Sequence, residues 1–113
     1  MASILADDSQ AVFVAVRERG GLSGFAEVSI HPHALGCQTH PVGYLEGWWV
    51  DPDLRRTGLG RQLVAAAENW ARAKGCREVA SDTDVGNDVS LTAHLALGYK
   101  QVGRVIPFNK RLD

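Results

Sequence analysis

The sequence predicts a mixed α/β fold in which one mostly antiparallel sheet carries helices. Three strand-like apolar segments come first, separated by turn or loop residues. A long amphipathic segment and a short strand follow, and this strand-helix-strand order predicts a right-handed parallel crossover between the third and fourth strands. The complete predicted order is β-β-β-α-β-α-β. The chain has 113 residues and no internal repeat, so we expect residues 1-113 to form a single domain.

The first three strands are expected to form an antiparallel meander. Ala11 to Val16 is almost entirely apolar, and the turn signal Gly20-Gly21 separates it from a second strand, Gly24 to Ile30. Residues His31 to His40 contain proline, glycine and several polar residues, which is typical of a loop. Val42 to Val50 is the third strand.

The second half of the chain alternates helices and strands. Leu59 to Lys74 is predicted to be a helix that ends at Gly75. Glu78 to Ser81 is then a short strand, Asp88 to Leu97 a second helix, and Tyr99 to Lys110 a last strand. The apolar stripe that identifies the long helix consists of Leu59, Leu63, Val64, Ala67, Trp70 and Ala71.

The composition argues against several classes of partner and compartment. Lys and Arg total 12 and Asp and Glu total 13, so no overall positive field favours nucleic acid or an anionic membrane. Cys37 and Cys76 are too few and too far apart for a disulfide framework. With no secretion signal or membrane span visible, we expect a cytoplasmic protein with free thiols.

The segment Arg55 to Gly60 reads Arg-Arg-Thr-Gly-Leu-Gly and lies between the third strand and the long helix. Backbone N–H groups and the helix dipole favour an anion there, glycines let phosphate oxygens approach, and Arg61 adds charge. By itself, this pattern fits a basic helix start without a ligand equally well. The Walker motif is absent, and Leu63 replaces the third glycine of the dinucleotide fingerprint.

The glycine segment fits the pattern [QR]-x-x-G-x-[GA] at Arg55, Gly58 and Gly60, and in this the chain resembles the GNAT family of N-acetyltransferases. Within that family it looks most similar to the aminoglycoside 6'-N-acetyltransferases. The resemblance covers about residues 11 to 110. The segments that carry it are Tyr44 to Pro52, Ala67 to Ala71, Ala80 to Thr83 and His94 to Tyr99.

The resemblance implies a GNAT-type sheet, mostly antiparallel, with a central parallel strand pair that splays apart and helices that flank it. Members of the family have a first strand and two helices before the strand that corresponds to Ala11 to Val16. We expect this chain to lack them, with Met1 to Ser9 as the tail of the second helix. An open edge on Ala11 to Val16 would invite pairing with another chain, so we expect a homodimer or strand exchange.

The resemblance also implies a site for acetyl-coenzyme A as co-substrate, with no metal. The glycine segment would cover the pyrophosphate, and the Val50 N–H would donate to the oxyanion of acyl transfer. Asn87 would contact the cofactor arm, or would simply cap the second helix. The residues implied to bind the cofactor are Trp49, Val50, Arg55, Arg56, Thr57, Gly58, Leu59, Gly60, Arg61 and Asn87.

In the resembled branch, carboxylates at the positions of Glu46 and Asp82 bind the ammonium groups of the acceptor and help to accept a proton. The alternative is a structural ion pair of Glu46 with Arg17 or Arg104. The residues implied to bind the acceptor are Glu46, Trp48, Asp82 and Asp84, although Trp48 and Trp49 are first expected in the core.

Two groups of histidines have a structural and a functional interpretation. His94 occupies the place of a family tyrosine that protonates the departing thiolate, but a hydrogen-bonded structural role is the more common one. Tyr99 is expected to pack. His31, His33, Cys37 and His40 lie within ten residues, yet their spacing fits no known zinc arrangement, so we expect loop or substrate-rim contacts.

Two functions follow from these observations. The first is an acetyl-CoA-dependent transferase that acts on a primary amine of a cationic small molecule, with the 6'-amino group of an aminoglycoside favoured. The second is a non-catalytic or residual acetyl-CoA-binding domain whose acceptor site is incomplete.

Overall fold

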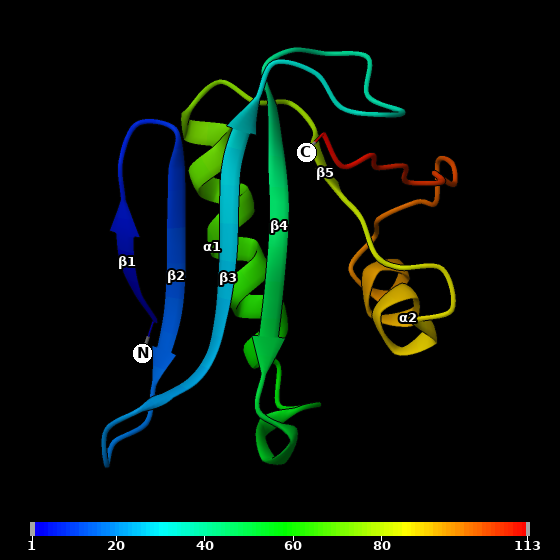
Figure 1. Ribbon diagram of the computed structural model, residues 1–113. Coiled ribbons are helices and arrows are strands. Elements are labelled where there is room, and N and C mark those ends of the chain that lie inside the picture. Colours follow the sequence, from blue (N-terminus) through cyan, green and yellow to red (C-terminus); the bar gives the residue numbers. More distant parts are fainter. Residues whose placement is uncertain (1, 113) are drawn as a thin grey trace. The chain divides into compact units, whose positions relative to one another are not determined.

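The computed structural model describes residues 2–112, and the side chains of residues 6–112. It divides into two units, one that ends at Asp82 and one that begins at Thr83. Figure 1 shows the first unit as a sheet with one helix and the second as a helix followed by an extended segment. No helix in the described residues is long and apolar enough to cross a membrane.

The first unit contains a five-stranded sheet with strand order β1-β2-β3-β4-β5. The first three pairings are antiparallel and the last, β4 with β5, is parallel. The predicted fold class, a mixed and mostly antiparallel sheet with one parallel pair, is therefore confirmed. The strands are β1 (Ala2–Ala6), β2 (Gln10–Val16), β3 (Leu22–His31), β4 (Val42–Val50) and β5 (Val79–Ser81).

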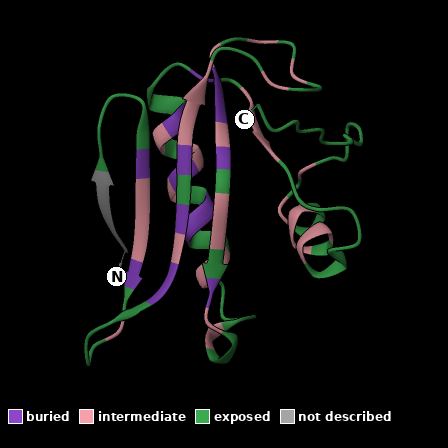
Figure 2. Ribbon diagram, in the orientation of Figure 1, coloured by how far each residue is buried: buried purple, intermediate pink, exposed green. Residues whose placement is uncertain are grey.

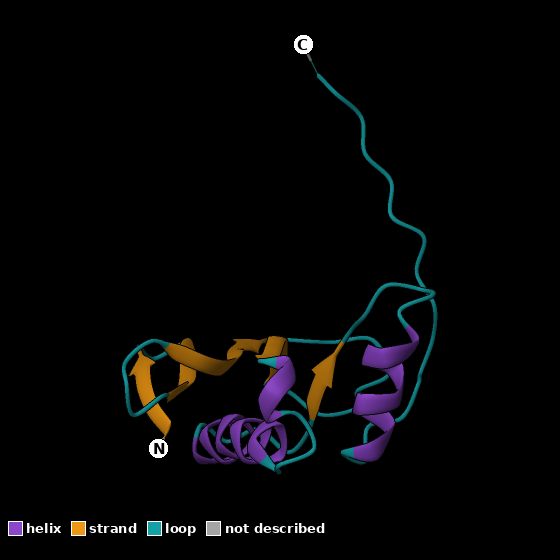
Figure 3. Ribbon diagram, turned by 90° about the horizontal axis from the view of Figure 1, so that it is seen from below, coloured by secondary structure: helices purple, strands orange, loops and turns teal. Residues whose placement is uncertain are grey.

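Helix α1 (Leu59–Ala73) covers one face of this sheet (Figure 3). Its apolar stripe packs on β2, β3 and β4, and Figure 2 shows buried positions on all four elements. Removing these side chains from water is the main favourable contribution to folding of this unit. The buried side chains include Ala26, Val28, Val42, Leu45, Leu63, Val64, Ala67 and Ala71.

The prediction for Met1 to Ser9 is wrong, because residues 2 to 6 form β1 instead of the tail of a helix. The side chain of Asp7 stabilises the turn after this strand: Oδ1 accepts hydrogen bonds from Ser9 N at 2.8 Å and Gln10 N at 3.0 Å. Aspartate commonly forms such turns. Since β1 pairs with β2 along its length, the expected open edge on Ala11 to Val16 is also wrong.

The prediction of a strand from Tyr99 to Lys110 is wrong as well. Residues after Gly98 have no strand structure, and the second unit contains α2 (Asp88–Ala96) as its one regular element among the described residues. A strand needs a hydrogen-bonded neighbour, and none lies in this unit. The apolar side chains that stay exposed are Val102, Val105, Ile106, Phe108 and Leu112.

The parallel pair β4–β5 separates after three residue pairs. Pairing runs from Gly43 with Val79 to Leu45 with Ser81, whereas β4 continues to Val50. At the same point β4 has an extra residue: Leu45 and Gly47 face consecutive residues of β3, so Glu46 lies in a β-bulge. Bulges often redirect a side chain next to an active site.

Candidate functional site

The glycine segment joins the end of β4 to α1 through a short 3-10 helix, η1 (Pro52–Leu54). Gly58 caps α1 with φ of +91°, and Arg56 has φ of +64°, a conformation that costs energy for a residue with a Cβ. No side chain caps α1 and no acidic residue lies in its first turn. The N–H groups of that turn therefore form a suitable site for an anion.

Gly60 keeps the first turn of α1 accessible. A Cβ placed at Gly60 would lie 3.5 Å from Val50 Cγ2 and 3.9 Å from Trp48 Nε1. The helix start is thus adjacent to the end of β4, and the absence of a side chain leaves space at the backbone between them. This arrangement fits a pyrophosphate group bound by backbone N–H groups.

Arg55 lies against β4. Its Nε donates to the Val50 carbonyl at 2.9 Å, and its guanidinium lies 4.6 Å from the ring centroid of Trp49. Trp49 is 49 % exposed, so the expectation that it is a core residue is wrong, while Trp48 is half-buried. The contact between the cation and the ring keeps the indole at the surface beside the glycine segment.

Arg17, which follows β2, connects the end of β4 to η1. Its Nη2 donates to Asp51 Oδ2 at 3.0 Å and to Asp53 Oδ1 at 2.8 Å. These bonds lower the pKa of both carboxyls. Trp49 Nε1 also donates to Asp51, at 3.1 Å. The alternative in which Arg17 pairs with Glu46 is therefore wrong.

The contribution of Arg17 to stability is expected to disappear in acid. Because the pKa values of Asp51 and Asp53 are below their ordinary value of 3.8 in the folded state, the stabilisation is complete above about pH 5 and is lost as pH falls through the pKa values of the folded state. Melting temperatures of the wild-type protein and Arg17→Met should differ by a constant amount above about pH 5 and converge below pH ~4. Arg19→Met is the control, and a difference independent of pH would contradict the assignment.

The Val50 N–H points away from β3. Asp51 N donates to Ser23 O at 2.8 Å, and in an antiparallel ladder the next pair, Val50 with Gly24, turns its backbone groups outward. The bond from Arg55 to the Val50 carbonyl agrees with this orientation. Since the pairing with β5 has already ended, the Val50 N–H lies at the open side of β4.

Glu46 lies in a small polar cluster on β3 and β4. Its Oε2 accepts hydrogen bonds from Ser29 Oγ and, at 2.8 Å, from His31 Nε2. The ring of His31 stacks on Tyr44, with centroids 4.4 Å apart and an angle of 11° between the planes. The Tyr44 hydroxyl donates to Asp82, which follows β5. The two predicted acids, Glu46 and Asp82, thus belong to one connected cluster at the point where β4 and β5 separate.

Tyr44 acts in this cluster as a hydrogen-bond donor. Partial burial, the bond to Asp82 and the negative charges of Asp82 and Glu46 raise the pKa of Tyr44 to about 12. The hydroxyl therefore keeps its proton at neutral pH and holds the Asp82 carboxylate in place. Ser29 and Tyr44 did not emerge from the sequence, although the period-two alternation of Tyr44 with Glu46 is a signal that could have found Tyr44.

The remaining histidines of the predicted loop do not gather around a common point. His31 lies at the end of β3, and the rings of His33 and His40 are 6.0 Å apart. In the residues that the structure describes, no three His, Cys, Asp or Glu side chains are arranged to hold a metal ion.

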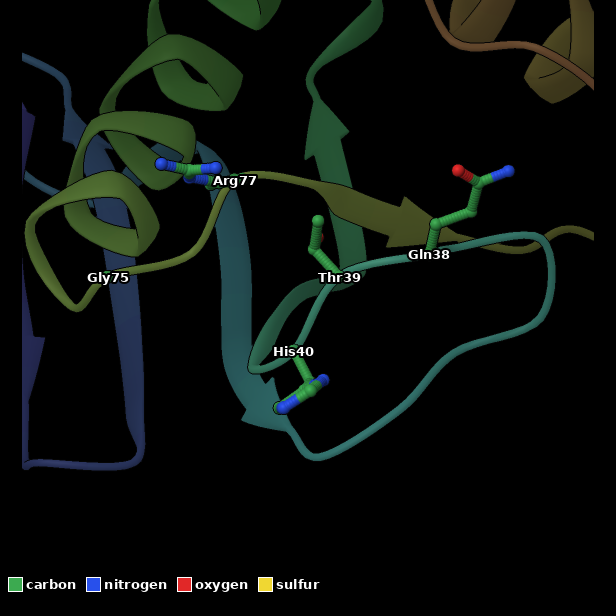
Figure 4. A pocket seen from close by; sticks show the side chains of 5 residues that line it. All are labelled: Gln38, Thr39, His40, Gly75 and Arg77. Atoms are coloured by element: carbon green, nitrogen blue, oxygen red, sulfur yellow. The ribbon is translucent and has the colours of Figure 1, made fainter.

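A shallow hollow of about 350 Å³ lies beside the loop that precedes β4 (Figure 4). It adjoins the C-terminal end of α1, whereas the glycine segment lies at the N-terminal end of that helix, about 22 Å away along its axis. The hollow is therefore not the predicted cofactor site. Its lining residues are Gln38, Thr39, His40, Gly75 and Arg77.

The second unit positions Asn87 and His94 on α2. Asn87 is the N-cap, and its side chain accepts a hydrogen bond from Ser90 N at 3.1 Å, which confirms the capping interpretation and leaves a cofactor contact as a prediction. His94 Nδ1 lies 2.8 Å from the Ser90 carbonyl. Nδ1 must therefore carry a proton, and Nε2 is the basic nitrogen of the neutral ring. Tyr99 packs edge-on against this ring, as expected, and Asp84 is exposed.

Comparisons with known proteins agree on one family. The family model described as Acetyltransferase (GNAT) family matches residues 1–99. The aminoglycoside N(6')-acetyltransferase type 1 of Klebsiella aerogenes is 51 % identical over 102 residues, which cover 90 % of this chain and 67 % of that protein. The protein of the same name from Stenotrophomonas maltophilia is 44 % identical over 110 residues and covers 96 % and 72 %.

Solved structures show the same similarity. Aminoglycoside N-acetyltransferase AAC(6')-Iy in complex with CoA has a TM-score of 0.87 and 44 % identity, and the match covers 95 % of this chain and 79 % of that one. The structure of AAC(6')-Iy in complex with the bisubstrate analog CoA-S-monomethyl-acetylneamine has a TM-score of 0.86 at the same identity and covers 94 % and 72 %.

Proposed function

Because the chain belongs to the GNAT family of acetyltransferases, we propose that it transfers the acetyl group of acetyl-coenzyme A to the 6'-amino group of an aminoglycoside. The names of the relatives and the CoA and bisubstrate-analog complexes of AAC(6')-Iy support this activity. The single observation in this chain that carries it is the cluster of Glu46 and Asp82 at the point where β4 and β5 separate.

The cofactor site that we propose extends from the end of β4 to the first turn of α1. The backbone N–H groups of Gly58, Leu59 and Gly60 would bind the pyrophosphate, and Arg56 and Arg61 would add positive charge. Arg55, Thr57 and Trp49 shape this segment, since Arg55 contacts Val50 and Trp49, and the Thr57 hydroxyl donates to the Leu54 carbonyl. Asn87 remains a proposed contact of the cofactor arm.

The acceptor site that we propose is acidic. An aminoglycoside carries several ammonium groups, and Glu46, Asp82 and Asp84 would attract them, with Trp48 as an apolar wall. The reacting amine must be neutral to attack the thioester, so its ammonium form first loses one proton, for which Glu46 is the proposed acceptor. A carboxylate can both attract an ammonium group and accept a proton from it.

The transfer step then needs an oxyanion donor and a proton for the leaving group. The amine nitrogen forms a bond to the thioester carbon, and the outward N–H of Val50 would stabilise the negative charge that develops on the thioester oxygen. The carbon–sulfur bond breaks, and the attacking nitrogen loses its second proton to water, which leaves the neutral amide. The departing thiolate takes up a proton, for which His94 in its protonated form is the proposed donor.

We also propose that the protein is a cytoplasmic homodimer that binds neither nucleic acid nor membranes. The net charge of −1 supports the absence of binding to nucleic acid and to anionic membranes. The exposed apolar side chains at residues 102, 105, 106, 108 and 112 support association, because a monomer seldom exposes so many in one short segment. A mass of about 24 kDa in solution, twice the 12.2 kDa of the chain, is the expected result of light scattering.

Thiol release from acetyl-coenzyme A over a panel of aminoglycosides and polyamines tests the activity. We expect release with compounds such as kanamycin and tobramycin, which have a 6'-amino group, and none with linear polyamines. Thermal stabilisation by coenzyme A, measured in parallel, reports cofactor binding without turnover. Stabilisation without thiol release across the panel would support a non-catalytic acetyl-CoA-binding domain and rule out the transferase.

A further inference from the structure

We propose that His31 is a positioning residue that fixes the carboxylate of Glu46 for the ammonium group of the acceptor. This inference rests on the proposed function, because it concerns the same acceptor site. His31 was expected to be a loop or substrate-rim residue, but it lies at the end of β3 with its Nε2 2.8 Å from Glu46 Oε2.

The two oxygens of the Glu46 carboxylate have different partners: protein groups bind one, and the other is left for the amine substrate. Ser29 Oγ and His31 Nε2 both contact Oε2 of Glu46. Within the described part of the chain, no donor contacts Oε1. The side chain of Glu46 is 35 % exposed, so solvent and an incoming cation can reach it. Oε1 is therefore the oxygen that accepts a hydrogen bond from the ammonium group of the amine substrate.

The bulge in β4 explains why this support is needed. Glu46 is the extra residue of the bulge and has no direct partner across the ladder, and a flexible glutamate at such a position has several rotamers. Two donors on one oxygen select one of these rotamers. His31 is itself held, because its ring stacks on Tyr44 with the planes 11° apart.

The stack also connects the two acids. Tyr44 contacts His31 with its ring face and donates its hydroxyl to Asp82. The separation of Glu46 from Asp82 is therefore set by a series of three contacts across β3, β4 and the end of β5. A cationic acceptor with more than one ammonium group meets two carboxylates at a fixed spacing, which favours rigid polyamines over flexible ones.

The test is a double-mutant cycle on tobramycin binding, measured by calorimetry in the presence of coenzyme A. His31→Phe keeps an aromatic ring for Tyr44 but removes the hydrogen bond to Glu46, and its Kd is expected to rise about 10-fold, as for loss of one charge-assisted hydrogen bond. His31→Gln places an N–H near the position of Nε2, and Kd is expected to return to within about 3-fold of wild type. In the Glu46→Gln background, His31→Phe is expected to change Kd by less than about 2-fold.

The outcomes separate this inference from the proposed function. Thiol release by the wild-type protein reports the function alone. An equal effect of His31→Phe in both backgrounds, or no rescue by His31→Gln, would overturn the role of His31 even if the enzyme is active. If the wild-type protein binds no tobramycin, both ideas are wrong. Thermal stabilisation by coenzyme A, retained in each variant, shows that the variants fold.

Discussion

Replacing Glu46 by glutamine is expected to lower kcat/KM for acetyl transfer to tobramycin by about 100-fold or more. Glutamine has nearly the same shape, so the strand and the bulge should be preserved. It carries no negative charge and cannot accept a proton from the acceptor ammonium. The hydrogen bonds from Ser29 and His31 end on an oxygen that is now neutral, so both binding and proton removal are weakened.

The thiol-release assay at saturating acetyl-coenzyme A measures this effect. Glu18→Gln, in the exposed turn between β2 and β3, is the matched control, since it removes the same charge away from the cluster. Asp82→Asn is expected to lower kcat/KM less than Glu46→Gln, because Tyr44 can still donate to the amide oxygen. Wild-type kcat/KM in Glu46→Gln would exclude this residue from the proton transfer.

Replacing Gly43 by alanine is expected to destabilise the first unit by about 1–3 kcal/mol. A Cβ at this position would lie 2.7 Å from the Cβ of Ala71 on α1 and 3.2 Å from Cγ2 of Val79 on β5. The Cβ of Ala71 can move only if α1 moves, and Val79 is β-branched, so its rotation about χ1 is restricted. The added methyl group thus forces apart the layers at the start of the parallel strand pair.

Urea denaturation, monitored by tryptophan fluorescence, measures the free energy of unfolding of Gly43→Ala and of Gly47→Ala. A Cβ at Gly47, in the same strand, meets nothing within 4 Å, so that variant should lie within about 0.5 kcal/mol of wild type or slightly above it. Equal stability of the two variants would show that the contact of Gly43 with Ala71 is not tight in solution.

The elements predicted most accurately from the sequence are those in which the spacing of apolar residues matches the face that is buried. The strand Val42–Val50 was predicted with its correct ends, and the helix that starts at Leu59 differs by one residue at its end. In both, the apolar residues recur with the period of the element and face the same core. β1 was not predicted because five residues are too few to show a clear strand period, although Asp7 and Ser9 form a recognisable turn before β2.

The candidate site was only partly predictable, for a different reason. Glu46 and Asp82 were expected from the resemblance to a family, but their partners Ser29 and His31 lie on β3, and Tyr44 lies on β4. Strand alternation alone cannot place Ser29 and His31 beside Glu46, because the bulge shifts the register of β4 by one residue. For the segment after Gly98, the alternating apolar residues suggested a strand, yet a strand forms only where a neighbour completes its hydrogen bonds.

A change in the length of β4 at Glu46 would alter the pairing of this strand with β3, because Glu46 is the extra residue of the bulge. The residues before it, Val42–Leu45, and those after it, Gly47–Val50, are two short segments that are out of phase with each other by one residue. Deleting Glu46 would join them into a regular ladder, and this should favour the sheet while it removes the acid. Stability and the proposed catalytic role of Glu46 thus place opposite demands on this one residue, and stabilised variants selected without an activity assay should accumulate deletions or substitutions there.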